Sequence, residues 1–110
     1  MKFGHLELTV RSPGESAAFF ADRLGFTLVA DQGGGFLWIE KGGLEILLRA
    51  GSPDPGRAEI VFYTNTLAED VARLESRGVA LEQRGHCHHF TDLDGHRFQL
   101  VNPHDDHSGS

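Results

Sequence analysis

Apolar and polar residues alternate near the start of the chain and then change to a helical spacing. Leu6, Leu8 and Val10 recur at every second position, which predicts a half-buried β-strand. The stretch 12–15, Ser-Pro-Gly-Glu, has the features of a helix N-terminus: a capping serine, a proline at the first helical position and a glutamate three residues after the serine. Apolar residues on one face then predict a helix that ends at Gly25.

Three short strands are predicted to follow this helix. They cover residues 26–30, 36–40 and 44–49, and glycine-rich turns separate them. The next stretch, residues 51–56, reads Gly-Ser-Pro-Asp-Pro-Gly. Two prolines and two glycines so close together suit neither a strand nor a helix, so we interpret this stretch as a linker.

The same order of elements begins again after the linker. A strand is predicted at 59–64, and a second helix is predicted to start with a capping box from Thr66 to Glu69 and to end at Gly78. The remaining strands are predicted at 79–82, 88–91 and 97–101. The chain therefore has two halves, each with the order strand, helix and three strands.

The two halves are related by a constant spacing. Thr66 follows Ser12 by 54 positions, and the glutamates of the two capping boxes have the same separation. Each half is too small to bury a core of its own. We therefore expect an α+β fold of two βαβββ modules, at residues 1–50 and 57–103, joined by the linker at 51–56. Their helices should pack on curved mixed sheets, and the opposite faces should form a concave cavity.

Composition limits the classes of protein and partner. The 110 residues of 12.1 kDa suit a single domain, residues 1–103, followed by a polar tail at 104–110 that we expect to be disordered. A net charge of −6 argues against nucleic acid, and no apolar run approaches the roughly 18 residues of a membrane span. The start of the chain lacks a secretion signal and Cys87 is the single cysteine, so we expect a cytoplasmic protein without an internal disulfide.

Two sequence strings carry a resemblance to a known family. FFADRLGF at 19–26 and FTDLDGHRFQLVNP at 90–103 are similar to motifs of the vicinal oxygen chelate superfamily. This superfamily includes glyoxalase I, bleomycin-resistance proteins, fosfomycin-resistance enzymes and extradiol dioxygenases. The resemblance covers the chain up to residue 103 and includes the duplicated βαβββ order. It implies the fold more specifically than the chemistry, because one fold carries many activities.

Strand pleating turns four polar residues away from the predicted helices. His5 and Glu59 occupy equivalent positions in the two modules, and so do Glu45 and Gln99. The resemblance implies that these four are metal ligands, although Glu59 stands where metal-dependent members usually have His, and Gln99 where they usually have Glu. The set would suit a divalent Ni, Mn, Fe, Co or Zn ion, with Glu45 or Glu59 available for proton transfer. Ordinary solvated strand residues are the alternative interpretation.

Further residues are candidates for substrate binding. Arg49 and Arg97 are candidate anchors for an anionic group, and surface ion pairing is the alternative for each. Trp38 and Tyr63, with Phe36, are expected to form an apolar wall, unless they belong to the core or to a dimer interface. His88 is a candidate substrate contact or proton shuttle. The run His-Cys-His-His at 86–89 cannot hold one ion with all four side chains, because neighbours on a strand point to opposite faces.

Two functional hypotheses follow from these candidates. The first is a divalent-metal-dependent enzyme of the lyase or isomerase type, glyoxalase-like, acting on a small oxygenated metabolite. The second is a metal-free protein that binds a small molecule or drug, like the bleomycin-resistance proteins. In either case we expect a homodimer, because exposed sheet edges of short modules pair across a two-fold axis. The cavity then lies either within one chain or between two.

Overall fold

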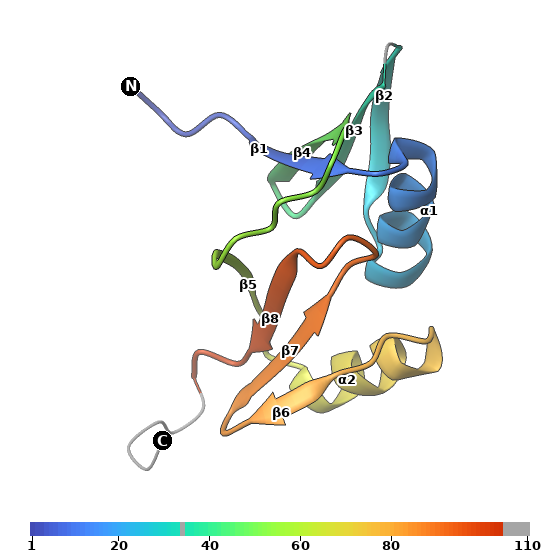
Figure 1. Cartoon of the computed structure of the whole chain (residues 1–110). Helices are drawn as coiled ribbons and strands as arrows, with labels where there is room; N and C mark the ends of the chain where they lie inside the picture. The colour runs from blue at the N-terminus through green and yellow to red at the C-terminus, as the bar shows by residue number, and fades with distance from the viewer. Residues whose placement is uncertain (34, 105–110) are drawn as a thin grey trace.

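The computed structural model describes residues 1–33 and 35–104, and it has two modules with the same order of elements (Figure 1). The first module consists of β1 (Leu6–Val10), α1 (Pro13–Leu24), β2 (Thr27–Gly33), β3 (Phe36–Lys41) and β4 (Leu44–Ala50). The second consists of β5 (Glu59–Tyr63), α2 (Leu67–Ser76), β6 (Glu82–Arg84), β7 (Cys87–Thr91) and β8 (Arg97–Val101). The predicted α+β fold of two βαβββ modules is confirmed. The tail expected at 104–110 lies, except for its first residue, outside the described residues.

Each module forms its own four-stranded mixed sheet. The strand orders are β1-β4-β3-β2 and β5-β8-β7-β6, so the two sheets have equivalent topology. In both, the first and last strands of the module pair in parallel, whereas the remaining pairs are antiparallel. β1 and β5 therefore lie at one edge of their sheets, with β4 and β8 next to them. Three of the predicted ligands lie on these strands, and His5 directly precedes β1.

The first helix begins and ends as its sequence predicts. The Ser12 hydroxyl accepts a hydrogen bond from the backbone N–H of Glu15 at 3.3 Å, and Pro13 opens the helix. At the other end, Gly25 adopts φ +80° and donates its N–H to the Ala21 carbonyl at 3.2 Å. A left-handed residue is needed there to close the last turn, and glycine adopts that conformation without steric cost.

The second helix begins differently from the prediction. Thr66 is the N-cap residue, but its side chain makes no capping hydrogen bond, so the predicted capping box from Thr66 to Glu69 is wrong. The Thr66 hydroxyl instead donates to the carboxylate of Asp70 at 3.1 Å. The same carboxylate accepts from the Thr64 hydroxyl and pairs with Arg73. A charged carboxylate is the stronger acceptor, and it has drawn the hydroxyl away from the helix backbone.

The strand predicted at 79–82 is also misplaced, since β6 starts only at Glu82. The backbone N–H of Val79 donates to the Leu74 carbonyl at 3.0 Å, so the chain is still closing the end of α2 at that point. Val79 is buried, with 6% of its surface exposed, and packs into the core without joining a ladder. The apolar residues at 79–82 therefore look like a strand in the sequence because Val79 is buried, although this segment begins as an irregular connection.

A single core connects the two modules through α1. Phe20 on α1 lies with its ring centroid 5.7 Å from that of Phe98 on β8, and Phe26 lies 6.2 Å from Phe62 on β5. Both contacts are edge-on, the arrangement that aromatic rings favour. The helix therefore packs against its own sheet and also against the sheet of the second module.

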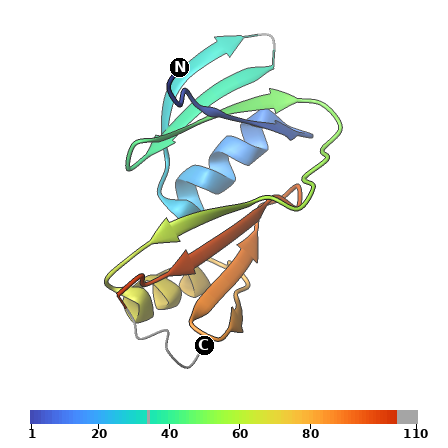
Figure 2. The ribbon, with the colours of Figure 1, turned by 90° about the vertical axis from the view of Figure 1, so that its left-hand side faces the viewer.

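The packing leaves one face of each sheet without a helix. Figure 1 shows α1 and α2 on the same side of the molecule, and Figure 2 is a view from the opposite side. We call the uncovered faces the open faces. They carry residues 7, 9, 36, 38, 40, 45, 47 and 49 in the first module and residues 59, 61, 63, 87, 89, 91, 97 and 99 in the second. Within the described ranges, no helix has the length and apolar character needed to cross a membrane.

Asp70 is the best test of how the second helix is fixed. Burial opposes ionisation of this carboxyl, but hydrogen bonds from Thr64, Arg73 and Thr66, with the charge of Arg73, lower its pKa. Because the pKa is lower in the folded state, the ionised Asp70 carboxylate stabilises the fold at pH values above its unfolded pKa of about 3.9. This contribution is lost as the pH falls through the lower pKa of the folded state. Asp70→Asn should therefore reduce the free energy of unfolding at pH 7 by no more than about 1 kcal/mol.

Urea unfolding at pH 7 and below pH 4 measures this dependence, and the difference between the variant and the original chain should shrink at the lower pH. Glu69→Gln is the matched control, because Glu69 is exposed and makes no ion pair within the described part of the chain. A loss that is equal at both pH values would contradict the assignment of the effect to the Asp70 carboxylate.

Candidate functional site

On the open face of the first module, His5 lies between an acid and an aromatic ring. Its Nε2 atom is 3.5 Å from Oε2 of Glu7, and its ring centroid is 4.4 Å from that of Trp38 in an edge-on arrangement. Leu6 pairs with Ile46 on β4, so His5 and Glu45 lie at the same end of the sheet. The imidazole of His5 is therefore held by its neighbours on the sheet surface.

Arg49, a predicted anion anchor, already has partners on this face. Its guanidinium forms an ion pair with Glu7 and lies over the ring of Phe36, 5.3 Å from the centroid. Glu7 thus contacts both His5 and Arg49. An incoming anion would have to compete with this carboxylate for the guanidinium.

Two carboxylates lie side by side at the end of this sheet. Glu40 on β3 pairs directly with Glu45 on β4, so both project from the open face. Glu45 is exposed, whereas Oε2 of Glu40 is buried and has no hydrogen-bond partner within the described residues. Buried polar atoms usually have a partner, so this oxygen is an acceptor that a ligand can reach only by displacing its neighbours.

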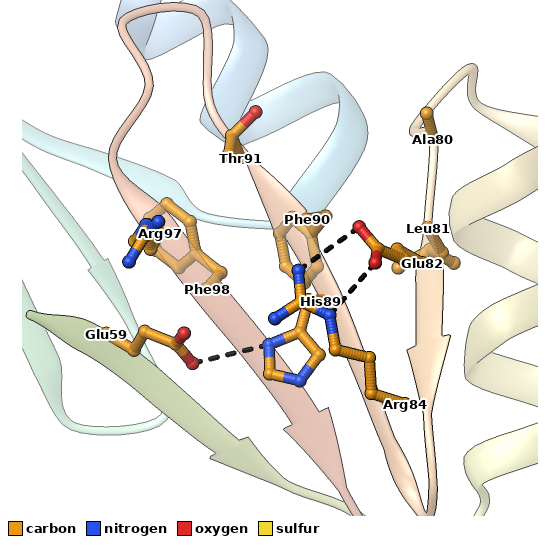
Figure 3. A pocket seen from close by; sticks show the side chains of 10 residues that line it. All are labelled: Glu59, Ala80, Leu81, Glu82, Arg84, His89, Phe90, Thr91, Arg97 and Phe98. Atoms are coloured by element: carbon orange, nitrogen blue, oxygen red, sulfur yellow. Dashed lines mark hydrogen bonds and ion pairs between the residues drawn. The ribbon is translucent and has the colours of Figure 1, made fainter. Parts of the chain in front are cut away.

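The open face of the second module brings together three polar residues. Glu59 on β5 lies with Oε2 3.4 Å from Nδ1 of His89 on β7 (Figure 3). His89 pairs with Gln99 on β8, and the Gln99 amide donates to the sulfur of Cys87 at 3.0 Å. Glu59 and Gln99 therefore share a face, as the pleat predicts, and His89 joins them.

Glu59 and His89 border a pocket of about 340 Å³ that is lined by both polar and apolar side chains. Glu82 and Arg84 form a two-pronged ion pair on one side, with distances of 2.9 and 3.2 Å. The hydrogen bond and charge of Arg84 hold the pKa of Glu82 below its ordinary value. Arg97 lies on the other side and makes no ion pair or side-chain hydrogen bond within the described residues (Figure 3). It is the cation of this pocket that remains available to a ligand.

His89 faces this pocket, whereas His88 lies on the opposite face of the strand. His88 pairs with Leu100, on the side that also carries the buried Phe90 and Phe98. His88, the predicted substrate contact or proton shuttle, therefore does not face this pocket, whereas its neighbour His89 does. Counting outward from a two-residue turn at Asp94-Gly95 would pair residue 89 with residue 100, whereas the observed register, centred on residue 94, pairs it with residue 99. The turn alone therefore does not predict which histidine faces the pocket.

The two predicted aromatic wall residues are in different environments. Trp38 is half-buried beside His5, so it forms part of the surface around that imidazole. Tyr63 lies at the end of β5 with 74% of its surface exposed. A large exposed aromatic ring is a common feature of ligand and subunit contacts.

The four predicted metal ligands lie on two separate sheets. His5 and Glu45 belong to the first module, and Glu59 and Gln99 to the second. His5 has Glu7 as a neighbour and Glu59 has His89. Over residues 1–33 and 35–104, no three His, Cys, Asp or Glu side chains are grouped so that they could hold a metal ion. The four residues therefore do not fit a metal site within one chain.

Comparison with known families identifies the class of protein. The family model of the Glyoxalase/Bleomycin resistance protein/Dioxygenase superfamily matches residues 2–100, and this chain belongs to that superfamily. The resemblance of the two sequence strings is thus confirmed. No curated protein matches the chain significantly by sequence.

Solved structures with the same fold include an antibiotic binding protein and a fosfomycin resistance protein. TnmS3, an antibiotic binding protein from Streptomyces sp. CB03234, is 28% identical, with a TM-score of 0.70 over 94% of this chain and 98% of its own. The fosfomycin resistance protein FosX from Listeria monocytogenes is 20% identical, with a TM-score of 0.78 over 92% of this chain and 90% of its own. A FosX variant complexed with Mn(II) and 1S,2S-dihydroxypropylphosphonic acid is 21% identical, with a TM-score of 0.76 over 91% and 88%.

Proposed function

We propose that this protein binds a small oxygenated anion on its open faces, with Arg97 as the group that recognises the anionic end. The observation that carries this proposal is the guanidinium of Arg97, which has no ion pair within the described residues and borders a pocket of about 340 Å³. A guanidinium binds a carboxylate or phosphonate through two parallel hydrogen bonds. The other cation of the pocket, Arg84, is already paired with Glu82.

The remaining pocket groups suit hydroxyl oxygens. Nδ1 of His89 is buried without a hydrogen-bond partner in the described residues, and Glu59 supplies carboxylate oxygens 3.4 Å away. A ligand hydroxyl can donate to the Glu59 carboxylate, whereas it can accept from the buried Nδ1 of His89 only by displacing the neighbours of that atom. The hydroxylated phosphonate in the FosX variant supports a ligand of this class, and the antibiotic binding by TnmS3 supports a binding function.

The second candidate function is a metal-dependent lyase or isomerase. It is favoured by the equivalent placement of His5 with Glu59 and of Glu45 with Gln99 in the two modules. It requires a second copy of the chain, because the described residues of one chain do not bring the four donors together. The open face of the first module in one copy would then face the open face of the second module in the other. Glu45 or Glu59 would then be the proton-transfer base, and the bound ion would be Ni, Mn, Fe, Co or Zn.

The second candidate requires a homodimer in which two copies complete each site, and in the first candidate a second copy would cover exposed apolar side chains. Val61 and Tyr63, on the open face of β5, are 45% and 74% exposed. Apolar side chains in this position are stabilised when a second surface covers them. The first module of one copy facing the second module of another would cover them and enclose the polar groups of both faces.

Calorimetric titration with 1S,2S-dihydroxypropylphosphonic acid, with lactate and phosphate as simpler anions, tests the two candidates. Metal-free protein should bind at least one of these anions, and Arg97→Gln should weaken binding about tenfold or more, because a charge-assisted contact is lost. Arg57→Gln is the matched control, since Arg57 is exposed just after the linker and lines none of the described pockets.

Binding that occurs only with added Mn(II), and that Glu45→Gln abolishes, would favour the metal-dependent enzyme instead. Absence of binding by all three anions, with and without Mn(II), would contradict both candidates.

Light scattering at micromolar concentration tests the dimer separately. The mass should be twice the 12.1 kDa of one chain, because the open faces carry exposed apolar surface that a second copy covers. A mass near 12.1 kDa would refute the dimer and leave the open-face site to a single chain.

A further inference from the structure

A second pocket lies on the helix side of the molecule, away from the open faces. Its volume is about 210 Å³, and it lies between the end of α1, the β3–β4 turn and α2. Its floor is apolar and includes Phe62, Leu74 and Leu100. We call it the rear pocket. None of the residues predicted from the sequence to bind metal or substrate lines it except Tyr63.

Four basic side chains stand around the rear pocket: Arg23, Lys41, Arg73 and Arg77. The whole chain has only ten Lys and Arg residues against sixteen Asp and Glu, so this concentration opposes the charge of the rest of the protein. It creates a local positive potential beside an apolar floor.

The one acid in the lining does not neutralise this cluster. Asp70 pairs with Arg73 and also accepts hydrogen bonds from Thr64 and Thr66. Its lowered pKa keeps it charged, and its charge is matched by Arg73 alone. The other three cations of the pocket have no carboxylate partner in the described part of the chain.

Two of these cations lie against the ends of the helices. A Cβ atom placed on Gly25 would be 3.1 Å from Nζ of Lys41, and one placed on Gly78 would be 3.6 Å from Nη1 of Arg23. Arg23 also lies over the ring of Phe19, 5.4 Å from the centroid. The side chain of Arg23 thus reaches from the first module to the end of α2 in the second.

Helix dipoles are the alternative explanation for the cluster. Cations near a helix C-terminus are stabilised by its partial negative charge, and this applies to Arg23 and Arg77. Lys41, the last residue of β3, also has its ammonium beside the end of α1. Helix dipoles therefore account for the position of each cation, but they do not require that these cations surround a hollow with an apolar floor. Unpaired cations around an apolar hollow are the features of a site for an anion with an apolar body.

We propose that the rear pocket binds a small organic anion whose charged head meets Arg23, Lys41 and Arg77 and whose compact apolar body lies on the floor. The volume of about 210 Å³ is below the roughly 300 Å³ at which drug-sized ligand sites begin, so the body is about the size of one ring. Residues of both modules line the pocket, and its occupant therefore also stabilises the junction between them.

Phenyl phosphate is a suitable probe. Its binding is followed through the amide chemical shifts of the full-length protein. We expect the signals of Gly25, Leu74 and Arg77 to move, and to move equally in the Arg97→Gln variant, which lacks the anion-binding group proposed for the open face. The double variant Lys41→Gln, Arg77→Gln should weaken binding about tenfold or more, since two charge-assisted contacts are lost. Arg57→Gln should bind as the original chain does, and the spectra also show whether each variant is folded.

Two analogues test the charged head and the apolar body of the ligand separately: one is neutral, and the other has no apolar group. Benzyl alcohol should bind at least about tenfold more weakly because it lacks the charge, and inorganic phosphate because it lacks the apolar body. Equal affinity for inorganic phosphate and phenyl phosphate would overturn the proposal, as would shifts confined to the open faces. An equal loss of affinity in Arg57→Gln and in the double variant would reduce the effect to general surface charge and would also overturn it.

Discussion

The contact between Phe20 on α1 and Phe98 on β8 is the constraint on which the rest of the structure depends. Two small modules cannot each enclose a core, and this contact joins their apolar surfaces into one. Phe98 also stacks with Phe62 and Phe90, so the helix of one module is held by the sheet of the other. The face of each sheet that does not contact this core then points away from the helices, and these two faces are the open faces.

Charge is distributed differently on the two sides of the molecule. On the open faces most charged groups are paired within one sheet, as Glu7 is with Arg49 and Glu82 with Arg84, which leaves Arg97 available. On the helix side the cations outnumber the acids around an apolar hollow. The two anion sites that we propose on this acidic protein therefore differ: one offers a single guanidinium, and the other offers several cations around an apolar floor.

The sequence predicts most of the fold because its local signals agree with the tertiary structure. The alternation from Leu6 to Val10, the Ser12 cap and the duplicated spacing each determine an element without reference to distant residues. The errors occur where one polar side chain has several possible partners, near or far along the chain. Thr66 lost its capping role to Asp70, and the ion pair with Glu7 that engages Arg49 depends on the register between β1 and β4.

The central claim is that the open face of the first module in one copy meets that of the second module in another. A spin label on Thr27→Cys in a Cys87→Ser chain tests it, because Thr27 lies at the edge of the first open face and belongs to no candidate site. Labelled chains are mixed with isotope-enriched chains that carry no label. The account predicts that Glu59, Val61 and Gln99 of the enriched copy lose signal intensity. Broadening confined to α1 and α2, or no broadening at all, would contradict it.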